Sequence, residues 1–178
     1  DWTPMHLAAR SGHKDVVEFL FQQDPTLAKE TNNAGRIPMH IAASNGHKDV
    51  VEFLFQQDPT LAREEDNAGR IPMHIAADNG HKDVVEFLFQ QDPTLAKEKD
   101  NAGWTPMHYA ASNGHKDVVE FLFQQDATLA KEKNNSGGTP MHDAAAHGHK
   151  DIVEFLFQQD ATLAREKDND GQTAGRPY

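Results

Sequence analysis

Apolar positions along the chain follow one pattern that recurs every 34 residues. The tripeptide Pro-Met-His marks this period and begins at Pro4, Pro38, Pro72, Pro106 and Pro140. The spacing predicts five units, over residues 1–34, 35–68, 69–102, 103–136 and 137–170, with a partial terminal unit over 171–178. We therefore expect a single repeat domain and not a globule built around one central core.

Each unit contains two short helix patterns. In the first unit, Thr3 and Pro4 suit the N-cap and first position of a helix, and Gly12 suits a left-handed stop. A second helix is predicted over residues 13–23, where apolar residues recur at helical spacing. Helices this short are marginal in water by themselves. Each unit must therefore bury its apolar face against the next one.

The end of the second helix is predicted at Asp24, because Pro25 disfavours helical geometry in the residue before it. Ala127 and Ala161 replace this proline in the last two units, so we expect a weaker stop there. A long polar loop anchored by Leu27 should follow and close on a turn of the type Asn-Asn-Ala-Gly.

The apolar positions that are identical or nearly so in all five units are expected to form the core. They are Met5, Ala8, Ala9, Val17, Leu20, Phe21, Leu27 and their equivalents. Phe19 and its equivalents widen the apolar side of the second helix, and we expect these residues to be buried. The alternative is an exposed phenylalanine ridge that would support lateral self-association.

Residues 103–122 read Gly-Trp-Thr-Pro-Met-His-Tyr-Ala-Ala-Ser-Asn-Gly-His-Lys-Asp-Val-Val-Glu-Phe-Leu. This segment resembles the ankyrin repeat, with its Thr-Pro-Leu-His-x-Ala-Ala and Gly-His-x-x-Val-Val-x-x-Leu motifs. The resemblance recurs in all five units and covers the chain except the terminal stub. It implies an all-α repeat solenoid, an ankyrin-type stack of helix-turn-helix units with projecting hairpin loops, whose concave side usually binds proteins.

Three features depart from the usual ankyrin pattern. The unit is one residue longer than the common period, with the extra residue in Gln-Gln-Asp-Pro-Thr-Leu-Ala, as in long-loop ankyrins. Ile37 and Ile71 replace the capping threonine, at a cost of about 1 kcal/mol each unless packing compensates. Neither end shows a strongly polar capping repeat, which suggests an array excised from a longer chain or one designed without caps.

The units differ most at their second, seventh and tenth positions. The second position holds Trp2, Arg36, Arg70, Trp104 and Gly138. The seventh holds Leu7, Ile41, Ile75, Tyr109 and Asp143, and the tenth holds Arg10, Ser44, Asp78, Ser112 and Ala146. The ankyrin resemblance places these positions on the concave, ligand-contacting surface.

Exposed Trp, Tyr and Arg are the residue types most often found at interface hot spots. We therefore predict that a partner protein or peptide contacts Trp2, Arg10, Arg36, Arg70, Asp78, Trp104, Tyr109, Ser112 and Asp143. The alternative is that the aromatic residues in this set pack locally against the neighbouring hairpin.

The net charge of −11 comes mostly from the repeated framework, because the invariant charges of each unit sum to −2. We expect this acidity on a solvated outer face. It also argues against a general nucleic-acid binder, which needs clustered Lys and Arg.

Cysteine is absent from the chain, which excludes disulfides, thiolate zinc sites and cysteine nucleophiles. No apolar run is long enough for a membrane span, and the first residues lack the pattern of a signal peptide. These features favour a cytoplasmic or otherwise intracellular protein, which we expect to be a monomer.

The repeated histidines His6 and His13 lack carboxylate or thiolate companions at ligand spacing. We expect them to hydrogen-bond to loop backbone. His147 and His149 form the one local histidine cluster, where adventitious metal binding is the alternative. The chain has no phosphate-binding glycine loop, nucleophile elbow or zinc-protease motif. We therefore expect no cofactor, no resident metal and no catalysis.

The sequence thus favours a non-catalytic protein–protein interaction scaffold that binds its partner through hairpin tips and first helices. The alternative is an engineered or purely architectural array with no natural ligand. Near-verbatim repetition of the second helix and its following loop favours either design or recent duplication.

Overall fold

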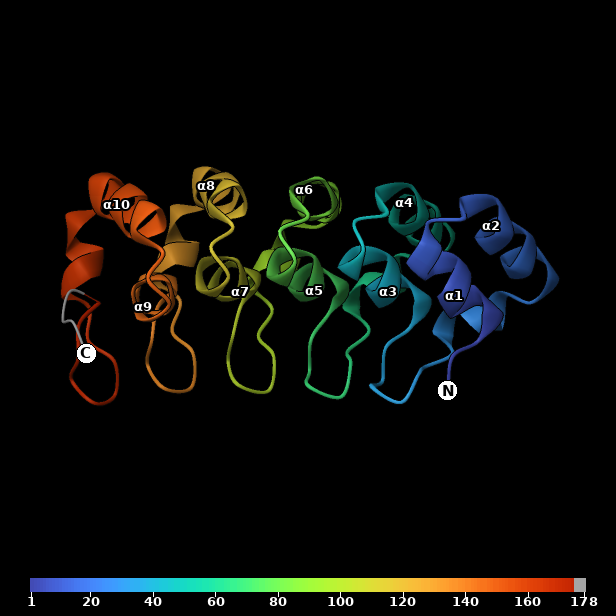
Figure 1. Ribbon diagram of the computed structural model, residues 1–178, viewed down its shortest axis with the longest axis horizontal. Helices are drawn as coiled ribbons and strands as arrows, with labels where there is room; N and C mark the ends of the chain where they lie inside the picture. The colour runs from blue at the N-terminus through green and yellow to red at the C-terminus, as the bar shows by residue number, and fades with distance from the viewer. Residues whose placement is uncertain (175–178) are drawn as a thin grey trace.

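The computed structural model describes residues 1–174 as two rows of helices with loops projecting from one side (Figure 1). The first helices of the units are α1 (Pro4–Ser11), α3 (Pro38–Ser44), α5 (Pro72–Asp78), α7 (Pro106–Ser112) and α9 (Pro140–Ala146). The second helices are α2 (Lys14–Gln23), α4 (Lys48–Gln57), α6 (Lys82–Gln91), α8 (Lys116–Gln125) and α10 (Lys150–Gln159). The predicted all-α repeat solenoid is confirmed.

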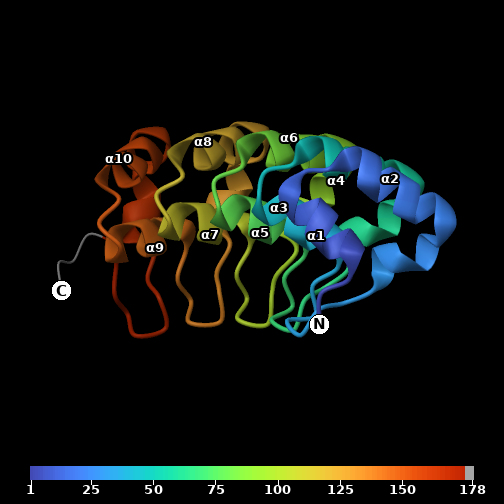
Figure 2. The same cartoon turned by 45° about the vertical axis from the view of Figure 1, so that its right-hand side comes forward.

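The row of even-numbered helices bows outward, and the odd-numbered helices and the hairpins lie on the opposite side of the stack (Figure 2). Successive odd-numbered helices pack side by side, as do successive even-numbered ones. No helix within residues 1–174 is long and apolar enough to cross a lipid bilayer.

A short 3₁₀ helix follows each second helix, in the segment expected to be an irregular polar loop. These helices are η1 (Pro25–Lys29), η2 (Pro59–Arg63), η3 (Pro93–Lys97), η4 (Ala127–Lys131) and η5 (Ala161–Arg165). The expectation of a weaker stop at Ala127 and Ala161 is wrong, since α8 and α10 end at the same point as the other second helices. The aspartate before each 3₁₀ helix explains this. Asp126 Oδ1 accepts the backbone N–H of Thr128 at 2.9 Å and its hydroxyl at 2.6 Å, without help from proline.

The two isoleucines that replace the capping threonine do not shift the start of their helices. Ile37 and Ile71 are only 2% and 3% exposed, and α3 and α5 begin at the same unit position as α7. The N–H of Ile37 also donates to Nδ1 of His40 at 3.3 Å. Burial of an apolar side chain therefore offsets the lost hydroxyl cap.

The core forms as expected around the methionines, alanines and valines of each unit, including Met5, Ala8, Ala9 and Val17. The predicted burial of the Phe21 position holds only in part, because four of its residues pack against the core but stay partly exposed. Its residues are half-buried or exposed, and they are Phe21, Phe55, Phe89, Phe123 and Phe157. The reason is that this position lies at the edge of the apolar stripe, where only the next unit covers it.

Rings at the Phe21 position pack edge-on against rings at the Phe19 position of the next unit. Phe21 and Phe53 have ring centroids 5.8 Å apart and planes at 88°, and the same arrangement recurs three more times along the stack. These pairs leave Phe53 and its later equivalents half-buried, whereas Phe19 is 59% exposed. The expectation that the Phe19 position is buried therefore holds only in part.

Two histidines in each unit after the first, and His6 alone in the first, connect the unit to its neighbours. Nε2–H of His40, on α3, donates to the carbonyl of Arg70 in the next hairpin at 2.9 Å. Nε2–H of His47 donates to the carbonyl of Arg10 in the preceding unit, also at 2.9 Å. Equivalent histidines make the same contacts along the stack. The predicted structural role of the histidines is confirmed.

The glycines that end the first helices offer a test of this packing between units. Gly80 and Gly148 both have left-handed backbone, with φ of +74° and +76°. A Cβ on Gly80 would lie 2.5 Å from Nδ1 of His115 in the next unit. A Cβ on Gly148 would meet none of the described atoms within 4 Å.

We expect Gly80→Ala to lower the free energy of unfolding by about 1–3 kcal/mol more than Gly148→Ala does. Both substitutions impose the same left-handed backbone strain, of roughly 1–2 kcal/mol, but only Gly80→Ala also pushes a side chain into the adjacent unit. Urea unfolding of the two variants measures the difference. Equal losses of unfolding free energy in the two variants would show that close contact with the next unit is not what requires glycine at position 80.

Candidate interaction face

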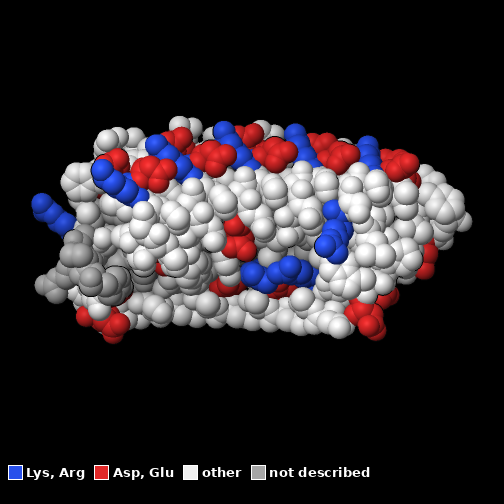
Figure 3. Space-filling view, in the orientation of Figure 1, with Lys and Arg blue, Asp and Glu red and all other residues white. Residues whose placement is uncertain are grey.

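The surface formed by the second, seventh and tenth unit positions, on the odd-numbered helices and hairpins, is here called the inner face. At the seventh position, Ile41 and Ile75 are buried and do not belong to this surface. In Figure 3, acidic and basic side chains alternate along the edge formed by the even-numbered helices. There, Lys–Glu pairs four residues apart repeat in every unit, as in Lys48–Glu52 at 3.2 Å. A separate basic patch lies nearer the hairpins (Figure 3). The framework charges are thus largely paired on the outer side.

Arg36 and Arg70 converge on one buried carboxylate, that of Asp66. Nε of Arg36 lies 3.3 Å from Asp66 Oδ2, and Nε and Nη2 of Arg70 lie 3.0 Å and 2.8 Å from the same oxygen. Burial by itself raises the pKa of Asp66, but hydrogen bonds from Arg70 and from backbone N–H groups outweigh it and leave the pKa below its ordinary value. Both arginines are half-buried, so each keeps part of its surface for contact.

Trp104 and Tyr109 form the aromatic part of the inner face. Their ring centroids are 5.1 Å apart, and the Tyr109 hydroxyl donates to Oδ2 of Asp100 at 2.6 Å. Burial and this carboxylate raise the pKa of Tyr109 above its ordinary value, so the phenol keeps its proton. The two rings are half-buried. The aromatic residues therefore pack locally, as the alternative interpretation expected, and each remains partly accessible.

The first unit presents a different pair. The guanidinium of Arg10 lies over the ring of Trp2, 5.6 Å from its centroid, and both side chains are exposed. This distance is within the range of a cation–π interaction. The first unit therefore shows how a guanidinium rests on the tryptophan at the second unit position.

Asp78 and Ser112 lie at the ends of α5 and α7. Asn113 donates from Nδ2 to Oδ1 of Asp78 at 2.8 Å, and burial raises the pKa of Asp78. Oγ of Ser112 lies 3.3 Å from Nδ1 of His147. His149 donates from Nε2 to the carbonyl of Ser112 at 2.8 Å. Both rings of the His147–His149 cluster thus have hydrogen-bond partners in the stack.

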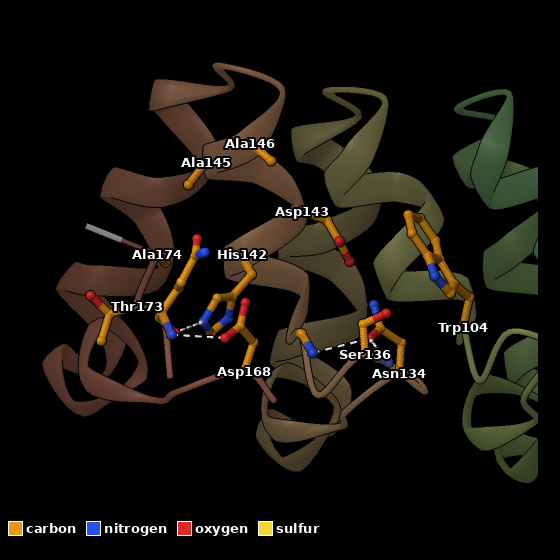
Figure 4. A pocket seen from close by; sticks show the side chains of 12 residues that line it. Trp104, Asn134, Ser136, His142, Asp143, Ala145, Ala146, Asp168, Thr173 and Ala174 are labelled. Carbon is orange, nitrogen blue, oxygen red and sulfur yellow. Dashed lines mark hydrogen bonds between the residues drawn. The ribbon is translucent and has the colours of Figure 1, made fainter. Parts of the chain in front are cut away.

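Asp143 lies in a pocket of about 220 Å³ that is also lined by Trp104, Gly138, His142 and Asp168. Figure 4 shows Asp143 between Trp104 on one side and His142 and Asp168 on the other. Oδ2 of Asp143 is buried and has no hydrogen-bond partner among the described residues. Burial raises the pKa of Asp143 to about 7.

The structure brings the nine predicted contact residues into three groups on one face. Trp2 and Arg10 lie in the first unit, and Arg36, Arg70, Asp78, Trp104, Tyr109 and Ser112 lie in the middle units. Asp143 lies in the pocket of the last full unit, which Trp104 also lines.

Sequence reasoning missed the hairpin aspartates Asp66, Asp100 and Asp168. It assigned their position to a turn, and Oδ1 of the residue there does accept two backbone N–H groups, whether it is Asp or Asn. The exchange of Asn for Asp between units is the signal that marks a second role, because only Asp adds a carboxylate oxygen.

A family model described as ankyrin repeats (3 copies) matches the chain over residues 1–63, 25–97, 60–131 and 93–168. A comparison with curated proteins gave no match. The successive overlapping matches follow the stack of units described above.

Proposed function

Because the chain belongs to the ankyrin-repeat family, we propose that it is a non-catalytic scaffold that binds a partner protein or peptide through its inner face. Ankyrin repeats are generally protein-interaction modules, and the family is typically non-catalytic. The proposal for this chain is more specific than the family role. It assigns binding to Trp2, Arg10 and the residues at equivalent unit positions.

One observation carries this proposal: the largest changes between units are concentrated on the inner face, whereas the second helix is nearly constant. The second helix reads Lys-Asp-Val-Val-Glu-Phe-Leu-Phe-Gln-Gln in four units and differs by one residue, Ile152, in the fifth. The second unit position, by contrast, holds Trp, Arg or Gly. A stack that needed only stability would gain nothing from such changes on one face. Variation concentrated on a face with accessible Trp, Tyr and Arg side chains supports contact with a partner.

The alternative is an engineered or purely architectural array without a natural ligand. Near-verbatim repetition of the outer helices is the observation that favours it. The alternative predicts that inner-face substitutions change stability only and never the capture of another protein.

Capture of a partner from a cell lysate by the immobilised chain tests the proposal. We expect Arg70→Ala and Trp104→Ala to reduce the amount of the same partner, identified by mass spectrometry, by at least about ten-fold, as for interface hot spots. Arg36 still pairs with Asp66 when Arg70 is removed, so the Arg70→Ala chain should fold.

Glu120→Ala is the matched control. Glu120 lies on α8 and pairs with Lys116 at 3.4 Å on the outer side of the stack. Its loss should leave capture unchanged, since exposed ion pairs contribute little. Undiminished capture by both inner-face variants would rule out the assigned face.

A further inference from the structure

Asp66 shows how this fold holds a guanidinium group in the inner face. Its Oδ1 accepts the backbone N–H groups of Ala68 and Arg70, at 2.9 Å and 3.0 Å, which fixes the direction of the carboxylate. Its Oδ2 then receives the side chains of Arg36 and Arg70, which occupy the second position of two successive units. The site is therefore a hairpin carboxylate between two cations.

Asp168 is the equivalent of Asp66 three units further along the stack. Its Oδ1 accepts the N–H groups of Asp170 and Gln172 at 3.0 Å and 2.8 Å, so the carboxylate has the same orientation. The residues that correspond to the two arginines are Gly138 and Gln172. No side chain within residues 1–174 donates a hydrogen bond to Oδ2 of Asp168.

The pocket lies at these two positions, with Gln172 in its wall. Gly138 supplies no side chain, and Asp143 replaces the larger Ile or Tyr of the three preceding units. At about 220 Å³ the pocket is smaller than the roughly 300–1,000 Å³ of sites for drug-sized ligands. Its size therefore suits one amino-acid side chain.

We propose that this pocket binds an arginine side chain of the partner, with its guanidinium paired to Asp143 and Asp168 and its stem along Trp104. Two carboxylates in a partly buried pocket favour a cation, and a planar guanidinium can donate to both. Arg10 over Trp2 shows the matching stack on a tryptophan at the same unit position. This inference rests on the proposed function, because it names the chemistry of the partner.

A bound cation would also pair with Oδ2 of Asp143, the one buried side-chain oxygen within residues 1–174 that has no partner. Oδ2 of Asp143 is buried without a hydrogen bond among the described residues, which disfavours its charged form. The other titratable side chains that line the pocket are His142 and Asp168. His142 already donates from Nε2 to the carbonyl of Gln172 at 3.2 Å. This N–H is therefore not available to the carboxylates of Asp143 and Asp168, which can pair with the ligand.

The test uses Nα-acetyl-L-arginine N-methylamide as the probe and its citrulline analogue, which has nearly the same shape without the charge. We expect the arginine probe, in an NMR titration of the labelled chain, to shift the amide signals of Gly138 and Thr173 in the pocket wall. The citrulline probe should bind at least about ten-fold more weakly. Asp143→Asn and Trp104→Ala should each weaken arginine binding by a similar factor. Asp151→Asn removes an equal charge from the exposed side of α10 and should change nothing.

All titrations are made in chains that also carry Arg176→Gln, so that this arginine of the chain itself does not compete with the probe. Equal affinity for arginine and citrulline, or unchanged affinity in Asp143→Asn, would overturn the inference. Failure here would leave the proposed function standing if Arg70→Ala still abolished capture of the partner. If the pocket did not select arginine and Arg70→Ala also captured the partner normally, both the inference and the proposed function would be rejected.

Discussion

At pH 7.5, the variant Asp143→Ile is expected to be more stable than the wild type by about 4 kcal/mol. The pKa of Asp143 is raised from 3.8 to about 7, so at this pH the folded chain holds a buried charge that the unfolded chain exposes to water. Isoleucine removes that penalty and restores the residue that Ile41 and Ile75 supply in the second and third units. Urea unfolding at pH 7.5 measures the difference.

The difference between Asp143→Ile and the wild type should shrink as the pH falls. A carboxyl group whose folded pKa is raised lowers stability above its unfolded pKa and ceases to do so once both states are protonated. From pH 7.5 to 4.5 the gap should fall to about 1 kcal/mol. A gap that does not change with pH would show that Asp143 is not a buried charge. Asp143→Asn is the control for shape, and it should gain less because its amide also lacks partners.

Acid is expected to destabilise the stack through its buried histidines. Burial lowers the pKa of His40 and of His108 to about 4. A histidine with a lowered folded pKa contributes stability above pH 6.5, and this contribution is lost as the pH falls toward 4. From pH 7 to 4.5 the two residues together should remove about 5 kcal/mol from the free energy of unfolding. The geometry agrees, since Nδ1 of each ring accepts a backbone N–H and has no room for a proton.

This loss is best measured in the Asp143→Ile chain, because Asp143 titrates in the opposite direction and partly hides it. Comparison with the double variant Asp143→Ile/His40→Gln isolates one histidine. The double variant should be less stable at pH 7 but should lose about 2.5 kcal/mol less on acidification to pH 4.5. His13→Gln, a change at an exposed histidine of the first unit, is the control and should keep the full acid loss. If the Asp143→Ile chain and the Asp143→Ile/His40→Gln chain lost the same stability on acidification, His40 would not be a source of the acid loss.

Asp143 connects stability to the inferred binding site. A residue that breaks the local rule of its unit position, at a cost in stability, is most often kept for function. Asp143→Ile should therefore give a more stable chain that no longer binds the arginine probe. The two effects of one substitution separate packing from recognition.

The period and the helix boundaries were predictable because they depend on local signals. Pro4 and Gly12 begin and end a helix by their own backbone preferences, and the structure repeats them in every unit. The burial of the Phe21 position was predicted only in part, because apolar spacing shows which side of a helix faces the core. It does not show where the core ends. The 3₁₀ helix was not predicted because its start depends on Asp24, whose Oδ1 accepts hydrogen bonds from the backbone N–H and the hydroxyl of Thr26. In the sequence, Pro25 indicated only where the preceding helix ends.

The inner face was predictable as a set of positions but not as a set of contacts. Comparison of units identified Arg36 and Arg70 but did not show that both side chains contact Asp66. Asp66 follows Arg36 by thirty residues and precedes Arg70 by four. The pocket could not be predicted from the sequence for a similar reason. It arises where Gly138 and Asp143 are both smaller than their equivalents in other units. The sequence does not show that these two small residues line the same pocket.

We propose that the partner binds the inner face and not the outer helices. The most direct measurement places a photo-crosslinking amino acid at Ser112, on the inner face, or at Asp117, exposed on α8. We expect the captured partner to become crosslinked from position 112 and not from position 117. Crosslinking from position 117 with none from position 112 would contradict it.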